Sequence, residues 1–195
     1  MASVDDLAAA ILKKTGTVTA MKMQKLVYYC QAWHLVRTRT TMFDDRIEAW
    51  REGPVVRALY ERHRKQYTVS GWPGDAQNLT ESERETVDWV HDKYAQMSAE
   101  SLSNMTHIEQ PWKIARGLTP LGEKSSATIS TSFMRDYHSR QVADVESAVA
   151  HAAANSSIEG VDLDSDWQDV LRSVATSMVD PDQAVREEIE RALRS

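Results

Sequence analysis

The chain has 195 residues, a net charge of −6 and 42% hydrophobic residues, a composition typical of a soluble globular protein. No segment approaches the roughly 20 consecutive apolar residues of a membrane-spanning helix, and residues 1–6 are acidic where a secretory signal would be basic. We therefore expect a cytoplasmic protein without membrane association. The single cysteine, Cys30, excludes an internal disulfide and any zinc site built from several cysteines.

The charge is unevenly distributed along the chain. Residues 1–140 hold 19 Lys and Arg against 17 Asp and Glu, a net charge of +2, whereas residues 141–195 hold 4 against 12, a net charge of −8. An acidic segment repels phosphates, so we expect no direct nucleic-acid binding. The acidic residues are typical of solvated helical faces, and they would equally suit a basic protein partner.

Hydrophobic periodicity predicts a mainly α-helical fold. Ser3 and Asp6 have the spacing of a capping box for a first helix that ends at Gly16. Thr19 is the predicted cap of a second helix. The bulky apolar stripe of this second helix predicts a central position in the core, and it consists of Met23, Leu26, Val27, Cys30 and Trp33.

The pattern changes to a period of two around residues 46–50, which predicts a short strand or one half of a small β-hairpin. Gly53-Pro54 then predicts the start of another helix, because proline is favoured at the first helical position. The apolar stripe of this helix would be Val55, Val56, Leu59 and Tyr60. Residues 67–79 contain several Gly and Pro and are predicted to form a loop.

Helical patterns return after this loop. Thr80 and Glu83 form a second capping box, Ser98 is the predicted cap of a short helix, and a brief helix is predicted from Pro111 to Gly117. Residues 118–128 look irregular, and residues 129–137 look helical.

The last part of the chain has its own amphipathic pattern. It predicts one helix over residues 142–152, a second capped by Ser165, and a third after Asp180-Pro181. We therefore expect one compact domain over residues 1–140 and an acidic helical extension over residues 141–195.

The sequence contains no assembled catalytic or metal-binding motif. No two of its six histidines lie four residues apart, as a metal-binding helix face requires. His107-Ile108-Glu109 matches half of a deaminase zinc signature, but the Pro-Cys-x-x-Cys half is absent. Cys30 has His34 one turn away but lies in an apolar stripe, which favours inert packing. We expect no enzyme activity, cofactor or metal.

Two segments are unusually rich in aromatic and polar residues: residues 47–56 and residues 106–112. Such a composition is typical of protein interfaces, where Trp, Tyr and Arg supply most of the binding energy. The alternative is that Trp50 and Trp112 belong to the core, with His107 and Glu109 bonding turn amides.

Three blocks of the sequence resemble the Panacea domain, a SocA-like antitoxin domain also met in phage-associated proteins called GepA. The first block is Met21-Lys22-Met23-Gln24-Lys25-Leu26-Val27-Tyr28-Tyr29-Cys30-Gln31-Ala32-Trp33-His34-Leu35. The second comprises Phe43-Asp44, Ile47-Glu48-Ala49-Trp50, Gly53-Pro54-Val55-Val56 and Leu59-Tyr60. The third comprises Leu102, Thr106-His107, Pro111-Trp112 and Ala115-Arg116. Cys30, which replaces a small residue, residues 66–79 and residues 141–195 depart from the family pattern.

This resemblance implies a compact helical domain that acts as the antitoxin of a type II toxin–antitoxin system, with a role in phage defence. Such antitoxins neutralise a cognate toxin, encoded by an adjacent gene, by direct protein–protein interaction. Their toxins are chemically diverse, and one class resembles small alarmone synthetases that modify tRNA. The sequence has no helix-turn-helix with a basic recognition helix, which a DNA-binding relative would need.

From the two segments and this resemblance we predict a toxin-binding surface. It comprises His34, Glu48, Trp50, Arg51, Pro54, Tyr60, His107 and Glu109. Two alternatives stay open: an adaptor that delivers a partner protein to a protease, and a small hydrolase that uses His107 and Glu109. The hydrolase requires these groups, with His34, to converge within hydrogen-bond reach. The sequence also leaves open a homo-oligomer.

Overall fold

A computed structural model describes residues 2–158 and 164–175. These residues are mainly helical with two small two-stranded sheets, which confirms the predicted fold class. The chain divides into two compact units, Met1–His138 and Ser139–Ser195. The helix predicted after Asp180-Pro181 lies outside the described residues.

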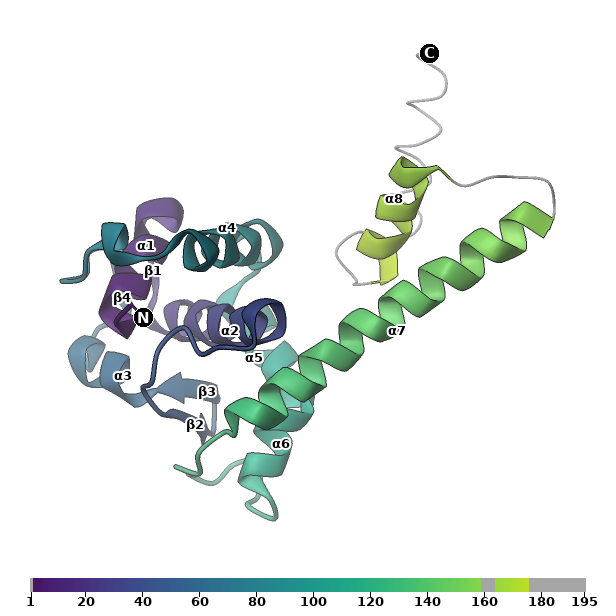
Figure 1. Cartoon of the computed structure of the whole chain (residues 1–195). Helices are drawn as coiled ribbons and strands as arrows, with labels where there is room; N and C mark the ends of the chain where they lie inside the picture. The colour runs from purple at the N-terminus through teal and green to yellow at the C-terminus, as the bar shows by residue number, and fades with distance from the viewer. Residues whose placement is uncertain (1, 159–163, 176–195) are drawn as a thin grey trace. The chain divides into compact units, whose positions relative to one another are not determined.

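The first unit contains both sheets and most of the helices (Figure 1). In chain order its elements are α1 Val4–Thr15, β1 Val18–Thr19, α2 Ala20–Thr38, β2 Ile47–Trp50, β3 Gly53–Val56, α3 Arg57–His63, β4 Thr68–Val69, the 3-10 helix Ala76–Asn78, α4 Glu81–Tyr94, α5 Ala99–Ile108, α6 Gln110–Arg116 and the start of α7 Thr131–Ile158.

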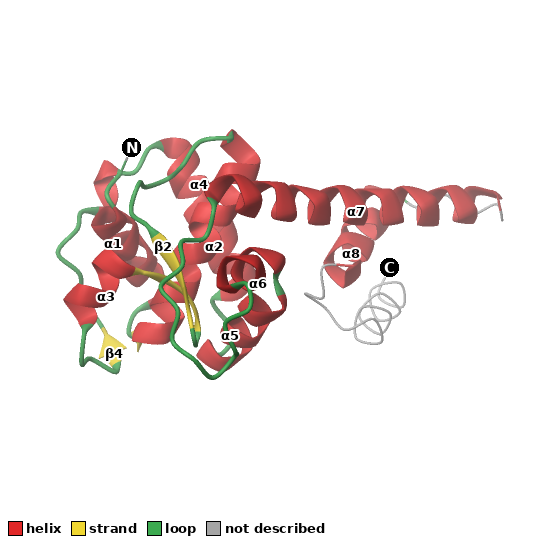
Figure 2. Cartoon of the chain, turned by 90° about the horizontal axis from the view of Figure 1, so that it is seen from below, coloured by secondary structure: helices red, strands yellow, loops and turns green. Residues whose placement is uncertain are grey.

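Helix α2 is the centre of the first unit, as its apolar stripe predicted. Every residue from Met23 to Leu35 is buried, including the polar ones between the apolar positions. Helices α1 and α4 pack against one side of α2, and β3 and α5 pack against the other (Figures 1 and 2). Because α2 is covered on all sides, each of its polar side chains needs a partner inside the domain.

The helix caps predicted at Ser3, Thr19 and Thr80 are present. Ser3 Oγ accepts a hydrogen bond from the Asp6 amide at 3.1 Å, and Asp6 Oδ2 accepts one from the Ser3 amide at 3.1 Å. Thr80 and Glu83 form the same reciprocal box at the start of α4. Thr19 caps α2 by accepting from the Lys22 amide at 3.1 Å. These helix starts were predictable because capping depends only on residues close in sequence.

The prediction of a helix start at Gly53-Pro54 is wrong. Residues 53–56 form β3, which pairs antiparallel with β2 so that Trp50 faces Gly53 and Ile47 faces Val56. Helix α3 begins only at Arg57. Pairing with β2 overrides the local preference of proline, and the positive φ of 101° at Gly53 lets the chain turn back after Arg51 and Glu52.

The other edge of β2 is also paired. The Ala49 amide donates to the Ala127 carbonyl at 2.8 Å, and the Ile129 amide donates to the Ile47 carbonyl at 2.8 Å. The segment after α6 therefore returns to the hairpin, where residues 127–129 lie alongside β2.

The structure adds detail to the loop predicted over residues 67–79. It contains β4, which pairs with β1, and the short 3-10 helix. Asp6 anchors this loop to α1, because its Oδ1 accepts from the Asp75 amide at 2.8 Å. Hydrogen bonds from Ser3 and the Asp75 amide lower the pKa of Asp6 to about 2.

Residues 131–158 form one continuous helix, α7, where two separate helices were predicted. The segment contains neither Gly nor Pro, so nothing in it ends the helix. In the second unit, α8 spans Ser165–Ala175. Its cap is Asp164 rather than the predicted Ser165, because Asp164 Oδ1 accepts from the Trp167 amide at 3.0 Å.

The second unit combines a charged contact with apolar burial. Arg172 Nε donates to Glu146 Oε1 at 2.8 Å, and Val149 is buried. Over residues 2–158 and 164–175, we find no helix with both the length and the apolarity to cross a bilayer.

Replacing Gly53 with Ala should destabilise the first unit. A Cβ atom there would lie 2.6 Å from Lys25 Nζ and 2.7 Å from Thr106 Oγ1, on a residue that already needs a positive φ. We expect the free energy of unfolding, measured by urea denaturation, to fall by about 2 kcal/mol. In the control Gly71→Ala the new Cβ meets nothing within 4 Å, so the change should stay within about 0.5 kcal/mol. Equal effects of the two variants would contradict this reading.

Candidate functional site

The outer edge of β3 is closed by two polar side chains of α2. Gln24 Oε1 accepts from the Val56 amide at 2.7 Å, and Gln24 Nε2 donates to the Val56 carbonyl at 3.3 Å. Lys25 Nζ donates to the Pro54 carbonyl at 3.1 Å. These bonds satisfy backbone groups that an edge strand would otherwise expose, so the edge offers no place for an added strand.

Helices α5 and α6 hold the other side of the same hairpin. Trp112 Nε1 donates to the Trp50 carbonyl at 2.9 Å, and Ser103 Oγ donates to the Glu52 carbonyl at 2.9 Å. Arg116 Nη1 donates to the Ala49 carbonyl at 3.3 Å. The three sequence blocks that resemble the Panacea domain therefore meet at the β2–β3 hairpin, whose backbone is fixed by side chains from three helices.

Lys25 is an unusual element of this arrangement, because its charged side chain is 1% exposed. Burial lowers its pKa to about 7, against the attraction of Glu52. Its ammonium lies against Gly53, which explains why a residue without a side chain occupies that position. Sequence reasoning missed Gln24 and Lys25, although two polar residues in a helix buried on every face are a usable signal.

The turn of the hairpin presents charged and aromatic groups to solvent. Arg51 and Glu52 are exposed and pair with each other at 2.8 Å. Trp50 is half-buried and packs edge-to-face on Tyr60 of α3, with ring centroids 4.6 Å apart. Trp50 Nε1 also donates to Glu48 Oε2 at 2.7 Å. The structure thus brings together four of the predicted residues: Glu48, Trp50, Arg51 and Tyr60.

His107 lies next to this group through Trp112. Its ring packs against the Trp112 ring at a centroid distance of 4.4 Å, and its Nε2 atom is buried without a hydrogen-bond partner among the residues described. Burial and the nearby Lys25 lower the pKa of His107. Trp112 belongs to the core, whereas Trp50 is only half-buried.

Glu109 lies in the core rather than on a surface. Its two carboxylate oxygens accept from the hydroxyls of Tyr28 and Tyr29, each at 2.9 Å. His138 Nε2 lies 3.7 Å from the same carboxylate. Burial raises the pKa of Glu109 to about 7, although both hydroxyls oppose the rise. The residue therefore joins α2, the α5–α6 junction and α7 from inside the first unit.

His34 and Pro54 are also buried. His34 Nδ1 lies 3.1 Å from Thr86 Oγ1, on the side of α2 that faces α4. Burial lowers the pKa of His34. The side chains of His34 and Glu109 accordingly lie away from the exposed turn. Their assignment to toxin binding stays a prediction, and in this fold they would act by supporting other elements.

The acid–base set of the hydrolase alternative is not brought together by the contacts seen here. His34 contacts Thr86, His107 packs on Trp112, and the histidine near Glu109 is His138. Cys30 is fully buried, which raises the pKa of its thiol well above the usual range. No group of three or more His, Cys, Asp or Glu that could hold a metal ion is found among the described residues.

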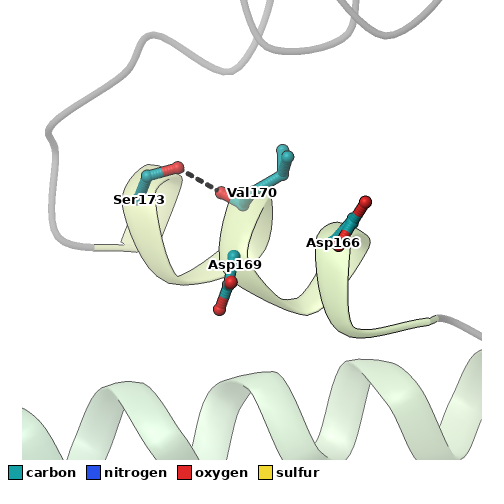
Figure 3. Close-up of a pocket in the computed structure, with 4 residues that line it drawn as sticks. All are labelled: Asp166, Asp169, Val170 and Ser173. Atoms are coloured by element: carbon teal, nitrogen blue, oxygen red, sulfur yellow. Dashed lines mark hydrogen bonds between the residues drawn. The ribbon is translucent and has the colours of Figure 1, made fainter.

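The second unit carries an open depression along one face of α8. Figure 3 shows its lining residues, Asp166, Asp169, Val170 and Ser173. Ser173 Oγ donates to the Val170 carbonyl at 2.7 Å, and Asp169 pairs with Arg172 at 2.7 Å. Asp169 and Ser173 thus have partners within α8 itself, which is typical of a solvated acidic helix face.

Comparison with known families identifies the part of the chain that builds the hairpin. Residues 23–113 match the family model described as "Antitoxin SocA-like, Panacea domain". This segment is similar to the Panacea domain. The match begins within α2 and ends within α6, so it contains nearly all of the three blocks and confirms the resemblance seen in the sequence. No curated protein and no solved structure matches the chain.

Replacing Glu109 with Gln should change how the stability of the first unit depends on pH. The folded pKa of Glu109 is about 7 and the ordinary value is 4.5, so the unfolded chain loses its proton first as the pH rises. The free energy of unfolding of the wild type should therefore fall between these two values, by up to about 3 kcal/mol relative to the variant.

Urea denaturation at pH 5 and pH 8 measures this difference. Glu109→Gln should gain stability over the wild type on going to pH 8, because glutamine does not titrate. Glu100→Gln, an exposed change on α5, should follow the wild type at both values. A Glu109→Gln effect that is equal at the two pH values would refute the raised pKa.

Proposed function

We propose that the chain is the antitoxin of a type II toxin–antitoxin pair and that it neutralises its toxin by direct binding. The description of the matched family supports an antitoxin that acts on a partner protein. The observation that carries the proposal is the β2–β3 hairpin, whose backbone is fixed from inside while its turn faces solvent. We place the pair in the cytoplasm, with a role in phage defence.

The hairpin has the physical properties of a binding element. Its carbonyls are already held by Lys25, Ser103 and Trp112, so little conformational entropy is lost when a partner binds the turn. The exposed and half-buried groups of the hairpin and of the adjoining helix α3 include Trp50, Arg51 and Tyr60, the residue types that dominate interface energetics. A stable complex buries about 800 Å² on each partner, so neighbouring surface must take part.

The buried members of the predicted site fit this proposal as supports. Glu48 holds the Trp50 indole, and Pro54 offers its carbonyl to Lys25. In this proposal Glu109 and His34 position α2 and the helices packed against it, and they make no direct contact with the toxin.

We further propose that the toxin is encoded by an adjacent gene and belongs to the tRNA-modifying, small alarmone synthetase-like class. A toxin that grips tRNA needs a basic surface, and residues 141–195 carry a net charge of −8. Long-range attraction between the two would speed their encounter.

Growth rescue and affinity test the hairpin proposal. The chain should restore growth when co-expressed with the toxic product of the adjacent gene. Arg51→Glu reverses an exposed charge on the turn and should weaken binding to that product at least tenfold, roughly the effect of losing a hot-spot residue. Lys13→Glu makes the same charge change on α1 and should keep the affinity within about twofold.

Two outcomes would oppose the proposal. Binding that is unchanged by Arg51→Glu would remove the hairpin from the interface. A fall in the cellular level of the partner, without neutralisation of its activity, would favour the protease-adaptor alternative over the antitoxin.

Association kinetics test the role of the acidic segment. A chain that ends after Arg140 should associate with the toxin about tenfold more slowly at low salt, because it lacks the attraction of residues 141–195. The rates of the two chains should converge at about 0.5 M salt, where charges are screened. Equal rates at low salt would show that the acidic residues are only a solvated surface.

A further inference from the structure

A short segment around α6 exposes several large apolar side chains. They are Ile108 at 70%, Ile114 at 59%, Leu118 at 102% and Leu121 at 72% exposed. The other exposed large apolar residues of the described chain are scattered, namely Met21, Tyr67 and Val142. Single exposed leucines are ordinary on a protein surface, whereas a concentration in one segment is typical of an interaction site.

The loop that carries the two leucines is held in place by a buried side chain. Arg116 Nη2 donates to the Pro120 carbonyl at 2.6 Å and to the Glu123 carbonyl at 2.9 Å. A turn hydrogen bond joins the Glu123 amide to the Pro120 carbonyl at 3.0 Å. Arg116 itself is 4% exposed and lies over the Trp112 ring at 4.9 Å. Leu118 and Leu121 are thus presented to solvent by a loop with its own internal support.

The same side chain connects this loop to the hairpin. Arg116 Nη1 donates to the Ala49 carbonyl of β2, and Trp112 of the same helix donates to the Trp50 carbonyl. One arginine therefore fixes both the loop and the strand that leads to the exposed turn. The two exposed regions belong to one preorganised part of the first unit.

We propose that Ile108, Ile114, Leu118 and Leu121 form a second part of the toxin-binding surface, covered by an apolar region of the same partner with acidic side chains at its edge. This inference rests on the proposed function. Exposed Lys113 and Lys124 lie in the same segment against the single exposed acid Glu123, so a partner with an acidic edge is complementary to it. This edge differs from the basic tRNA-binding surface proposed to meet residues 141–195.

The area of the four exposed apolar side chains, called the apolar set below, favours binding to the toxin over binding to a second copy of the chain. Four such side chains expose on the order of 500 Å², less than the roughly 800 Å² that each member of a stable complex buries. The set needs a neighbouring surface, which the hairpin supplies. Pairing with a second copy would instead bring the lysines of two identical surfaces together.

The test is a double variant, Leu118→Ser with Leu121→Ser, in the full chain. Its affinity for the toxic product of the adjacent gene, measured by calorimetry, should fall at least tenfold, roughly as for a hot-spot pair, and growth rescue should be lost. Tyr67→Ser removes a similarly exposed apolar side chain near β4 and should leave the affinity within about twofold. If the first double variant lowers the melting temperature, the same affinity measurement is repeated with a second double variant, Ile108→Ser with Ile114→Ser, whose changes lie on α5 and α6.

The outcomes separate the two proposals. If the wild type neither binds nor rescues, the proposed function fails, and this inference fails with it. If the wild type binds and both double variants bind equally well, only this inference fails. Light scattering of the chain alone tests whether a second copy of the chain binds the four apolar side chains instead. A dimer that becomes a monomer in the Leu118→Ser, Leu121→Ser variant would assign these side chains to self-association and overturn the proposal.

Discussion

The structure of the first unit depends on one arrangement, in which backbone carbonyls of a two-stranded hairpin accept hydrogen bonds from buried side chains of distant helices. Four carbonyls within residues 49–54 each accept from a different side chain, namely Lys25, Ser103, Trp112 or Arg116. A buried donor that loses its partner costs about 1–3 kcal/mol. The three sequence blocks are therefore tied to one another, and the hairpin can keep one conformation although it is too small to be stable alone.

The sequence predicted the features that depend on near neighbours. The capping boxes at Ser3 and Thr80 and the central place of α2 could be found because their signals are local or periodic. Strand β3 could not be predicted, because Gly53-Pro54 by itself favours a helix start. The strand depends on pairing with β2 and on hydrogen bonds from Gln24 and Lys25, which are distant in sequence. The same limit applies to the site: Trp50 and Tyr60 were predicted and do meet, whereas the depth of Glu109 depends on how three elements pack.

Two buried ionisable groups give this domain opposite responses to pH. Burial raises the pKa of Glu109 to about 7 and lowers the pKa of Lys25 to about 7. Glu109 lowers stability as the pH rises toward that value, and Lys25 adds stability as the pH rises beyond it. Near neutrality both groups therefore contribute least to stability, which is the cost of using a lysine and a glutamate to connect buried elements.

The sealed edge of β3 has a consequence for how recognition can diversify. Gln24 and Lys25 already bond the backbone groups of β3 to which an added strand could pair. Under the proposed function, discrimination between partners would therefore come from the side chains of Arg51, Glu52 and their surroundings. Arg51 and Glu52 are exposed and pair with each other, and Arg51 in particular can be exchanged without removing a donor that fixes the hairpin backbone. Under the proposed function, substitutions at the turn would change which partner is bound while the fold of the first unit stays the same, as loops on a rigid scaffold commonly do.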